Sequence, residues 1–129
     1  MSYALDVVGD KWTLLVMRDL IMGGKRYFQD FLESDEKIAS NILSSRLKLL
    51  ECAGIITRAT DPAHGRRVIY TPTAKALDLL PAMLELMRWS AVHDPKTGVP
   101  PAFVRRIANH RDATVAEIRA RHEAVRRSS

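Results

Sequence analysis

One stretch of the sequence limits the possible fold more than any other, because it joins a helix directly to a small hairpin. Apolar residues recur at helical spacing over about 39–53, and Gly54 follows; glycine most easily adopts the left-handed conformation that ends a helix. Two short alternating runs, 55–60 and 67–71, then flank a polar loop that contains glycine, as in a β-hairpin. This arrangement predicts a mainly α-helical fold with a small β-hairpin.

Further amphipathic segments lie on both sides of this unit. Apolar side chains at helical spacing predict a helix over residues 11–22, ended by a Gly-Gly pair, and short helical turns over 28–32. After the hairpin, residues 74–91 hold helical spacing again, and Pro81 either kinks this long helix or marks its true start. The predicted order is therefore helix, short helix, turn, helix, hairpin and long helix.

The chain of 129 residues has room for one domain and a terminal extension. We expect a domain over residues 1–92 that includes the long helix, a linker over 93–101 that is rich in proline, and a C-terminal helical extension over 102–129. In the extension, residues 103–110 predict a short helix. The capping-box spacing that begins at Thr114 predicts the start of a second one.

Composition excludes several classes of protein. Hydrophobic residues make up 47% of the chain and charged residues 27%, which is typical of a soluble domain. A single cysteine, Cys52, cannot form an internal disulfide. The sequence has no uncharged apolar run near the ~18 residues of a membrane span, and it shows no secretory signal. These features predict a cytoplasmic protein that does not bind membranes.

Positive charge is concentrated in two blocks, although the whole chain carries only +5. Residues 37–75 hold seven basic and two acidic side chains, and residues 102–129 hold seven basic and three acidic ones. Residues 1–36, by contrast, are net acidic. A local basic surface is typical of proteins that bind polyanions, but the ordinary solvated surfaces of many proteins are also basic.

The helix over 39–53 has one polar face, formed by short hydrogen-bonding side chains and one lysine. These residues are Ser40, Asn41, Ser44, Ser45 and Lys48. A helix fits the major groove of B-form DNA with its first turns against the base edges, where asparagine can bind adenine through two hydrogen bonds and serine can donate or accept. The alternative is a solvated amphipathic helix, because serine and asparagine also suit helix starts.

The hairpin that follows adds positive charge beside this polar face. Its loop and second strand carry His64, Arg66 and Arg67. A basic hairpin next to such a helix predicts a wing that contacts the phosphate backbone or the minor groove of DNA. Arg26, at the start of a supporting segment, is either a further phosphate contact or an ordinary surface charge. The predicted nucleic-acid site therefore combines the helix and the hairpin.

Arg46 has a different position, because the helical wheel places it on the apolar side of the helix. An arginine in such a place needs a carboxylate or a phosphate as its partner. It either reaches the DNA backbone or forms an internal pair with Asp19 or Glu33. The internal pair is the favoured interpretation, and Arg46 is kept as a candidate DNA contact.

The sequence contains no recognisable pattern of catalytic, metal-binding or cofactor-binding residues. The four histidines lack metal-ligand spacing, and there is no nucleophile elbow, phosphate-binding glycine loop or dinucleotide fingerprint. We therefore predict no enzyme activity, no metal and no cofactor. Trp12 and Trp89 are expected in the core or in an interface between subunits.

Several segments, in the same order along the chain, resemble the HxlR-type regulators. The segments are residues 4–15 (ALDVVGDKWTLL), 26–28 (RYF), 42–51 (ILSSRLKLLE), 54–56 (GII) and 70–73 (YTPT). HxlR-type regulators are bacterial and archaeal winged helix-turn-helix transcription factors related to the MarR group. The resemblance covers about residues 4–91, and it is more specific than any one of its segments.

The resemblance implies a winged helix-turn-helix with C-terminal dimerisation helices and one wing in each subunit. It also implies a homodimer that binds a pseudo-palindromic operator in double-stranded DNA. Together with the polar helix face and the basic hairpin, this predicts a sequence-specific DNA-binding regulator of transcription that acts as a repressor. The alternative is a winged-helix module that binds another protein. The sequence also leaves room for an unidentified small-molecule effector and specifies no ligand.

One feature that is common in the family is missing from this chain. Many members carry a redox-sensing cysteine just before the Ala-Leu-Asp run, where this chain has Met1, Ser2 and Tyr3. Thiol sensing by that route is therefore not expected. Cys52, near the end of the helix over 39–53, is expected to be a small structural residue.

Overall fold

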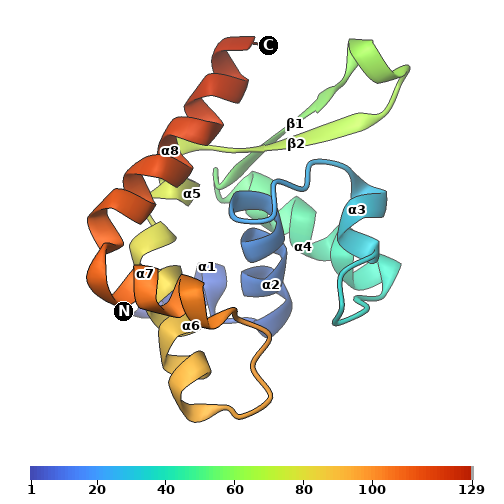
Figure 1. Cartoon of the computed structure of the whole chain (residues 1–129). Helices are drawn as coiled ribbons and strands as arrows, with labels where there is room; N and C mark the ends of the chain where they lie inside the picture. The colour runs from blue at the N-terminus through green and yellow to red at the C-terminus, as the bar shows by residue number, and fades with distance from the viewer. Residues whose placement is uncertain (129) are drawn as a thin grey trace. The chain divides into compact units, whose positions relative to one another are not determined.

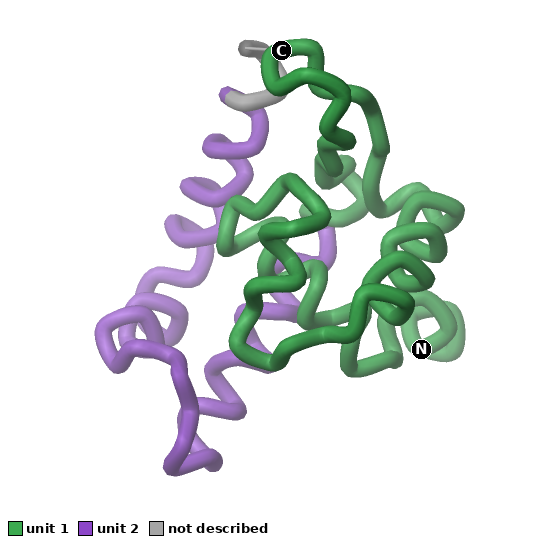
Figure 2. The backbone as a smooth tube through the Cα atoms, turned by 90° about the vertical axis from the view of Figure 1, so that its right-hand side faces the viewer, with its two compact units in different colours: residues 1–77 green, residues 78–129 purple. Residues whose placement is uncertain are grey.

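The computed structural model describes residues 1–128, with side chains up to residue 124. Its contacts divide the chain into two compact units, Met1–Leu77 and Asp78–Ser129, which Figure 2 shows in different colours. This division falls inside the predicted domain of residues 1–92, so the predicted domain, linker and extension stay predictions. The C-terminal end of the predicted extension, residue 129, lies outside the described residues.

Unit 1, Met1–Leu77, is mainly helical and contains one two-stranded hairpin, which confirms the predicted fold class (Figure 1). In chain order its elements are α1 (Ser2–Val8), α2 (Lys11–Ile21), α3 (Phe28–Leu32), α4 (Ser40–Cys52), β1 (Ile56–Thr60), the 3-10 helix η1 (Pro62–His64), β2 (Val68–Pro72) and α5 (Ala74–Leu77). Helix α1 is an addition to the predicted order, since its seven residues are too few for a clear helical period.

The core of unit 1 forms where α2 packs against α4. Helix α2 begins at Lys11 because the carboxylate of Asp10 caps it, accepting a hydrogen bond from the Thr13 amide at 3.1 Å. Leu20 of α2 and Leu43 of α4 are fully buried. Since the apolar side of α4 is used for this packing, the polar side of α4 faces away from the core.

Strands β1 and β2 form an antiparallel hairpin in which Ile56 is opposite Pro72 and Thr60 is opposite Val68. The pair at the base, Ile56 and Pro72, is buried, whereas the rest of β1 is exposed. Gly65 in the connecting loop has a φ of 69°, in the left-handed region that favours glycine. The hairpin is therefore anchored at its base and projects as a wing (Figure 1).

The predicted long helix over 74–91 is two helices, because α5 ends at Leu77 and α6 (Leu80–His93) begins after it. Pro81 lies in the first turn of α6. Proline has no amide hydrogen, and its ring clashes with the carbonyl four residues earlier, so a continuous helix through this segment is disfavoured. Of the two predicted outcomes the structure shows the second, in which Pro81 marks the start of a helix.

Unit 2, Asp78–Ser129, contains three helices that pack against one another, namely α6, α7 (Pro101–Asn109) and α8 (Arg111–Ser128). The predicted start of the last helix at Thr114 is wrong, because α8 begins at Arg111. Thr114 is buried and its hydroxyl donates to the His110 carbonyl at 2.9 Å, so it bonds back along the helix instead of capping it. In the described part of the chain no helix is long and apolar enough to cross a bilayer.

An ion pair between α2 and the turn before α4 predicts a loss of stability in acid. Arg18 donates to the two carboxylate oxygens of Glu36 at 3.0 and 2.8 Å, and this contact lowers the pKa of Glu36 to about 2. Because the pKa in the folded state is below that of the unfolded chain, the stabilisation is complete only above about pH 4.5. It is lost as the pH falls toward 2.

Glu36→Gln is therefore expected to lower the free energy of unfolding by about 1 kcal/mol at pH 7, the upper range for a solvent-accessible pair. The loss is expected to be smaller at pH 3, where the unfolded carboxyl group is already protonated. Urea unfolding of both proteins at the two pH values measures this difference. Equal destabilisation at pH 3 and pH 7 would contradict the ion-pair account.

Candidate nucleic-acid interface

The predicted polar face of α4 is open to solvent. All five of its residues are exposed, namely Ser40, Asn41, Ser44, Ser45 and Lys48. On the opposite side of the helix, Leu43, Leu47 and Leu50 are buried in the core of unit 1. Helix α4 is thus packed against the core through its leucines, and its polar face points to solvent.

Among the described residues, no side chain caps the first turn of α4. The N-cap residue is Ala39, which provides no side-chain hydrogen bond to the helix. Ser40 and Asn41 lie inside the first turn and not at the capping position, so capping does not account for their presence. The free amides and the positive end of the helix dipole at such a terminus favour a nearby phosphate.

The wing presents the basic side chains that the sequence predicts for it. Arg66 and Arg67 are exposed near its tip, and the Arg67 guanidinium lies 3.9 Å from the centre of the Tyr27 ring. His64 is exposed too, but its Nδ1 lies 2.9 Å from an oxygen of the Asp61 carboxylate. The Nδ1 nitrogen of His64 is therefore used inside the wing.

Arg26 holds the second strand of the wing. Its Nε donates to the Tyr70 carbonyl at 2.8 Å and its Nη2 donates to the Thr71 hydroxyl at 2.7 Å. The Tyr70 amide in turn donates to the Arg26 carbonyl at 2.8 Å. Partial burial lowers the pKa of Arg26. The structure thus gives Arg26 an internal role, and its contact with a phosphate stays a prediction.

The internal partner of Arg46 is Asp10, which corrects the predicted pairing with Asp19 or Glu33. The Nε of Arg46 donates to Asp10 Oδ2 at 2.6 Å, and Nη2 lies 3.4 Å from Oδ1. Asp19 instead lies 2.8 Å from the guanidinium of its neighbour Arg18. Because Asp10 comes close to Arg46 only when α2 packs on α4, the helical wheel could not identify it.

Asp10 therefore stabilises the fold in two ways, and its removal should be measurable. Its carboxylate caps α2 and binds Arg46, whose hydrogen bond lowers the pKa of Asp10. Asp10→Ala is expected to lower the free energy of unfolding by ~1 kcal/mol through the lost cap alone. Asp10→Asn retains a capping oxygen and should lose less. Urea unfolding gives both values, and an Asp10→Ala protein as stable as the wild type would contradict these roles.

The two basic blocks differ in how their charges are compensated. In unit 2, described arginines of α7 and α8 pair with acidic side chains of the same unit, and these pairs are Arg106–Glu117, Arg111–Glu85 and Arg119–Asp78. Among the described residues, no carboxylate forms an ion pair with Lys48, Arg66 or Arg67. Positive charge at these three residues of α4 and the wing is therefore uncompensated, which favours this surface as the site for a polyanion.

Three residues of this surface were missed by the sequence analysis. Arg58 on β1 is exposed, and its place in an alternating strand was the signal that could have revealed it. Tyr27 and Asp10 bind residues that are 34 and 36 positions away along the chain. No local pattern identifies such pairs, because they form only when separate elements pack together.

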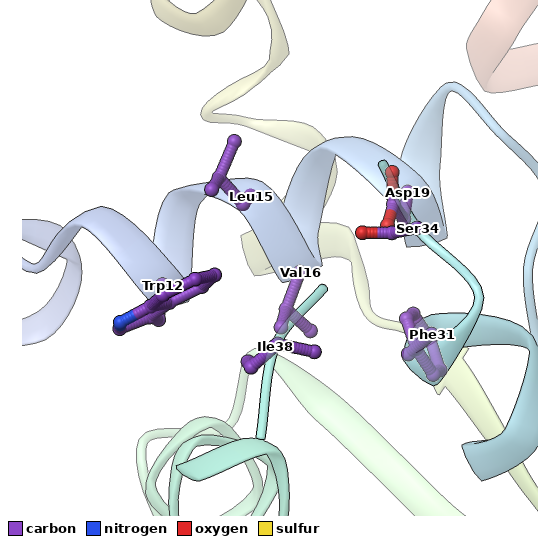
Figure 3. A pocket seen from close by; sticks show the side chains of 7 residues that line it. All are labelled: Trp12, Leu15, Val16, Asp19, Phe31, Ser34 and Ile38. Carbon is purple, nitrogen blue, oxygen red and sulfur yellow. The ribbon is translucent and has the colours of Figure 1, made fainter. Parts of the chain in front are cut away.

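A small hollow lies in unit 1 between α2, α3 and the segment that leads into α4 (Figure 3). It is lined by Trp12, Leu15, Val16, Asp19, Phe31, Ser34 and Ile38. Its empty volume is about 180 Å³, part of which is open to solvent. Because that volume includes open solvent, the enclosed space is far smaller than the roughly 300–1,000 Å³ of usual small-molecule sites. The hollow therefore identifies no effector, and the effector stays a prediction.

A short helix and an outward-facing second helix, followed directly by a two-stranded wing, define a winged helix-turn-helix protein. A family model described as HxlR-like helix-turn-helix matches residues 7–97. The chain belongs to this HxlR-like family, as the sequence motifs predict.

Curated relatives and solved structures agree with this assignment. The uncharacterized HTH-type transcriptional regulator Rv3095 of Mycobacterium tuberculosis is 34% identical over 102 residues, which cover 79% of this chain and 63% of the relative. The HTH-type transcriptional regulator YodB of Bacillus subtilis is 33% identical over 90 residues, which cover 70% of this chain and 80% of YodB. This chain thus spans less than two thirds of the length of the mycobacterial relative.

Two of the similar solved structures have the same winged-helix fold. The reduced form of YodB superposes with a TM-score of 0.62 at 29% identity, covering 74% of this chain and 92% of YodB. The redox regulator HypR in its reduced form superposes with a TM-score of 0.65 at 26% identity, covering 73% of this chain and 92% of HypR. The winged helix that the sequence predicts is therefore confirmed.

Proposed function

We propose that this protein is a sequence-specific DNA-binding regulator of transcription, which acts in the cytoplasm as a homodimer on a pseudo-palindromic operator. The observation that carries the proposal is the exposed polar face of α4 beside a wing that carries exposed arginines. The regulators YodB and HypR, which share the fold, support it. We propose repression as its mode of action, because repression requires only that a promoter be occupied.

In this proposal the two parts of the surface have different tasks. Helix α4 enters the major groove, where Asn41 can bind adenine and Ser44 can donate to or accept from a base edge. Arg66 and Arg67 of the wing bind phosphates or enter the minor groove, which positions the protein without reading sequence. The buried leucines of α4 keep its orientation fixed relative to the core of unit 1.

Exposed apolar side chains support the pairing of two copies. Leu86, Trp89 and Val92 of α6 are 54%, 59% and 59% exposed, so Trp89 does not lie in the core. Tyr3 and Leu5 of α1 are also exposed. Single exposed apolar residues are ordinary, whereas several along one helix are typical of an interaction surface. A symmetric dimer would present two α4 helices to one duplex about 34–36 Å apart.

Arg66→Ala is expected to weaken binding to all DNA sequences alike and to lower the slope of log affinity against log salt by about one. Fluorescence anisotropy with a labelled duplex of random sequence, between ~50 and 200 mM salt, measures this slope. Arg105→Ala removes an exposed arginine of α7 instead and should keep the wild-type slope. A wild-type protein that binds no duplex even at low salt would contradict the proposed function.

A further inference from the structure

Tyr27 joins the helix-turn-helix to the wing through both its hydroxyl and its ring. Its hydroxyl donates to Asp61 Oδ2 at 2.5 Å, and the Arg67 guanidinium lies over its ring, 3.9 Å from the ring centre. The backbone of Tyr27 is itself fixed, because it is the N-cap residue of α3 and its carbonyl accepts from the Asp30 amide at 3.0 Å. The hydroxyl also lies 3.3 Å from Nδ1 of His64. The ring is thus held by the helix-turn-helix, and these side-chain contacts are all with the wing.

Asp61 is the centre of a hydrogen-bond cluster within the wing. Besides the Tyr27 hydroxyl, its carboxylate binds the Ala63 amide at 3.0 Å and lies 2.9 Å from Nδ1 of His64. Its backbone amide donates to the Arg67 carbonyl at 2.7 Å, which closes the hairpin. The hydrogen bond from Tyr27 lowers the pKa of Asp61, so the group is held in its charged form.

The position of Asp61 matters for DNA binding, because it carries the only carboxylate of residues 55–72. A carboxylate that faced a phosphate would repel it. Only 12% of the Asp61 side chain is exposed, and Tyr27 covers it from the side of the helix-turn-helix. The acidic group therefore serves as an internal anchor, and the arginines beside it remain on the outer surface of the wing.

We infer that Tyr27 is a positioning residue for DNA binding, which sets the tip of the wing through its hydroxyl and orients Arg67 through its ring. This inference rests on the proposed function. An arginine stacked on an aromatic ring is ordered before the duplex arrives, so less conformational entropy is lost on binding. Tyr27 acts through Asp61 and Arg67, and it requires no contact of its own with the DNA.

Tyr27→Phe and Tyr27→Leu separate the two contacts. Phenylalanine keeps the ring beneath Arg67 and loses the bond to Asp61, whereas leucine loses both contacts. With a labelled duplex of random sequence as the probe, Tyr27→Phe is expected to weaken binding about threefold and Tyr27→Leu about tenfold. The salt slope of Tyr27→Leu should fall toward that of Arg67→Ala.

Double substitutions distinguish positioning from a general loss of stability. If Tyr27 orients Arg67, Tyr27→Leu should cost much less affinity in an Arg67→Ala protein than in the wild type. Effects of Tyr27→Leu and Arg67→Ala that simply multiply would overturn the inference. In case Tyr27→Leu does not fold, Tyr27→Phe combined with Asp61→Asn gives a second cycle, in which the two effects should again be less than multiplicative.

The same titration separates this inference from the proposed function. A wild-type protein that fails to bind the duplex contradicts the proposed function itself. The wild-type protein could bind with the expected salt dependence while Tyr27→Phe and Tyr27→Leu both bind as tightly as the wild type. That result contradicts only the role of Tyr27. Circular dichroism and thermal unfolding of each variant confirm that the compared proteins are folded.

Discussion

Ser44→Glu is expected to lower the affinity for DNA by at least about a hundredfold, because it places a carboxylate on the face of α4 that would meet phosphates and base edges. Ser44 is exposed, and the leucines behind it stay buried. Substitutions at exposed positions of this kind usually change stability by less than about 0.5 kcal/mol. Fluorescence anisotropy with duplex DNA and urea unfolding measure the two effects separately.

Two control variants show whether the position or the charge is responsible. Ser44→Ala removes the hydroxyl alone and should cause a much smaller loss of affinity. Gly98→Glu adds the same charge in the loop after α6, where an added Cβ would meet no atom within 4 Å. It should bind DNA almost as well as the wild type. Equal losses in Ser44→Glu and Gly98→Glu would contradict a direct role for α4.

Replacing both Leu86 and Trp89 by glutamate is expected to convert the proposed dimer into monomers. Burial of a large apolar side chain contributes ~1.5–3 kcal/mol, and an unpaired charge in the same place is unfavourable. The dissociation constant of the dimer should therefore rise by at least about a thousandfold. Both side chains are more than half exposed in the chain itself, so the fold should persist. Sedimentation analysis at micromolar concentration measures the change.

Lys96→Gln combined with Gly98→Glu is a matched control, because it changes the net charge by the same amount in the loop that follows α6. This control should remain dimeric. A wild-type protein that is monomeric at micromolar concentration would contradict the proposed dimer. So would a double glutamate variant that stays dimeric.

Much of the fold was predictable from the sequence because the signals are local. The bounds of α4 are Ser40–Cys52, within one residue of the predicted 39–53, since helical spacing and the left-handed Gly54 are read directly from neighbouring residues. The strands likewise lie within one residue of the predicted runs. The predicted domain over residues 1–92 stays a prediction, because a break after Leu77 divides the predicted long helix between two compact units.

In the candidate site, too, the features set by one helix were predictable, whereas contacts between separate elements were not. A helical wheel is sufficient to predict that Asn41 and Lys48 face outward, because the apolar residues of one helix decide which side is buried. The partner of Arg46 and the contacts of Tyr27 depend on how separate elements pack, so they could not be predicted from spacing. Cys52, expected to be structural, is exposed at the end of α4.

Selection of bound fragments from a pool of random double-stranded DNA tests most directly whether α4 and the wing read a sequence. The account predicts one enriched motif made of two half-sites related by two-fold symmetry, with centres 10–10.5 base pairs apart or a multiple of that spacing. A pool from which the folded protein enriches no motif would contradict the account.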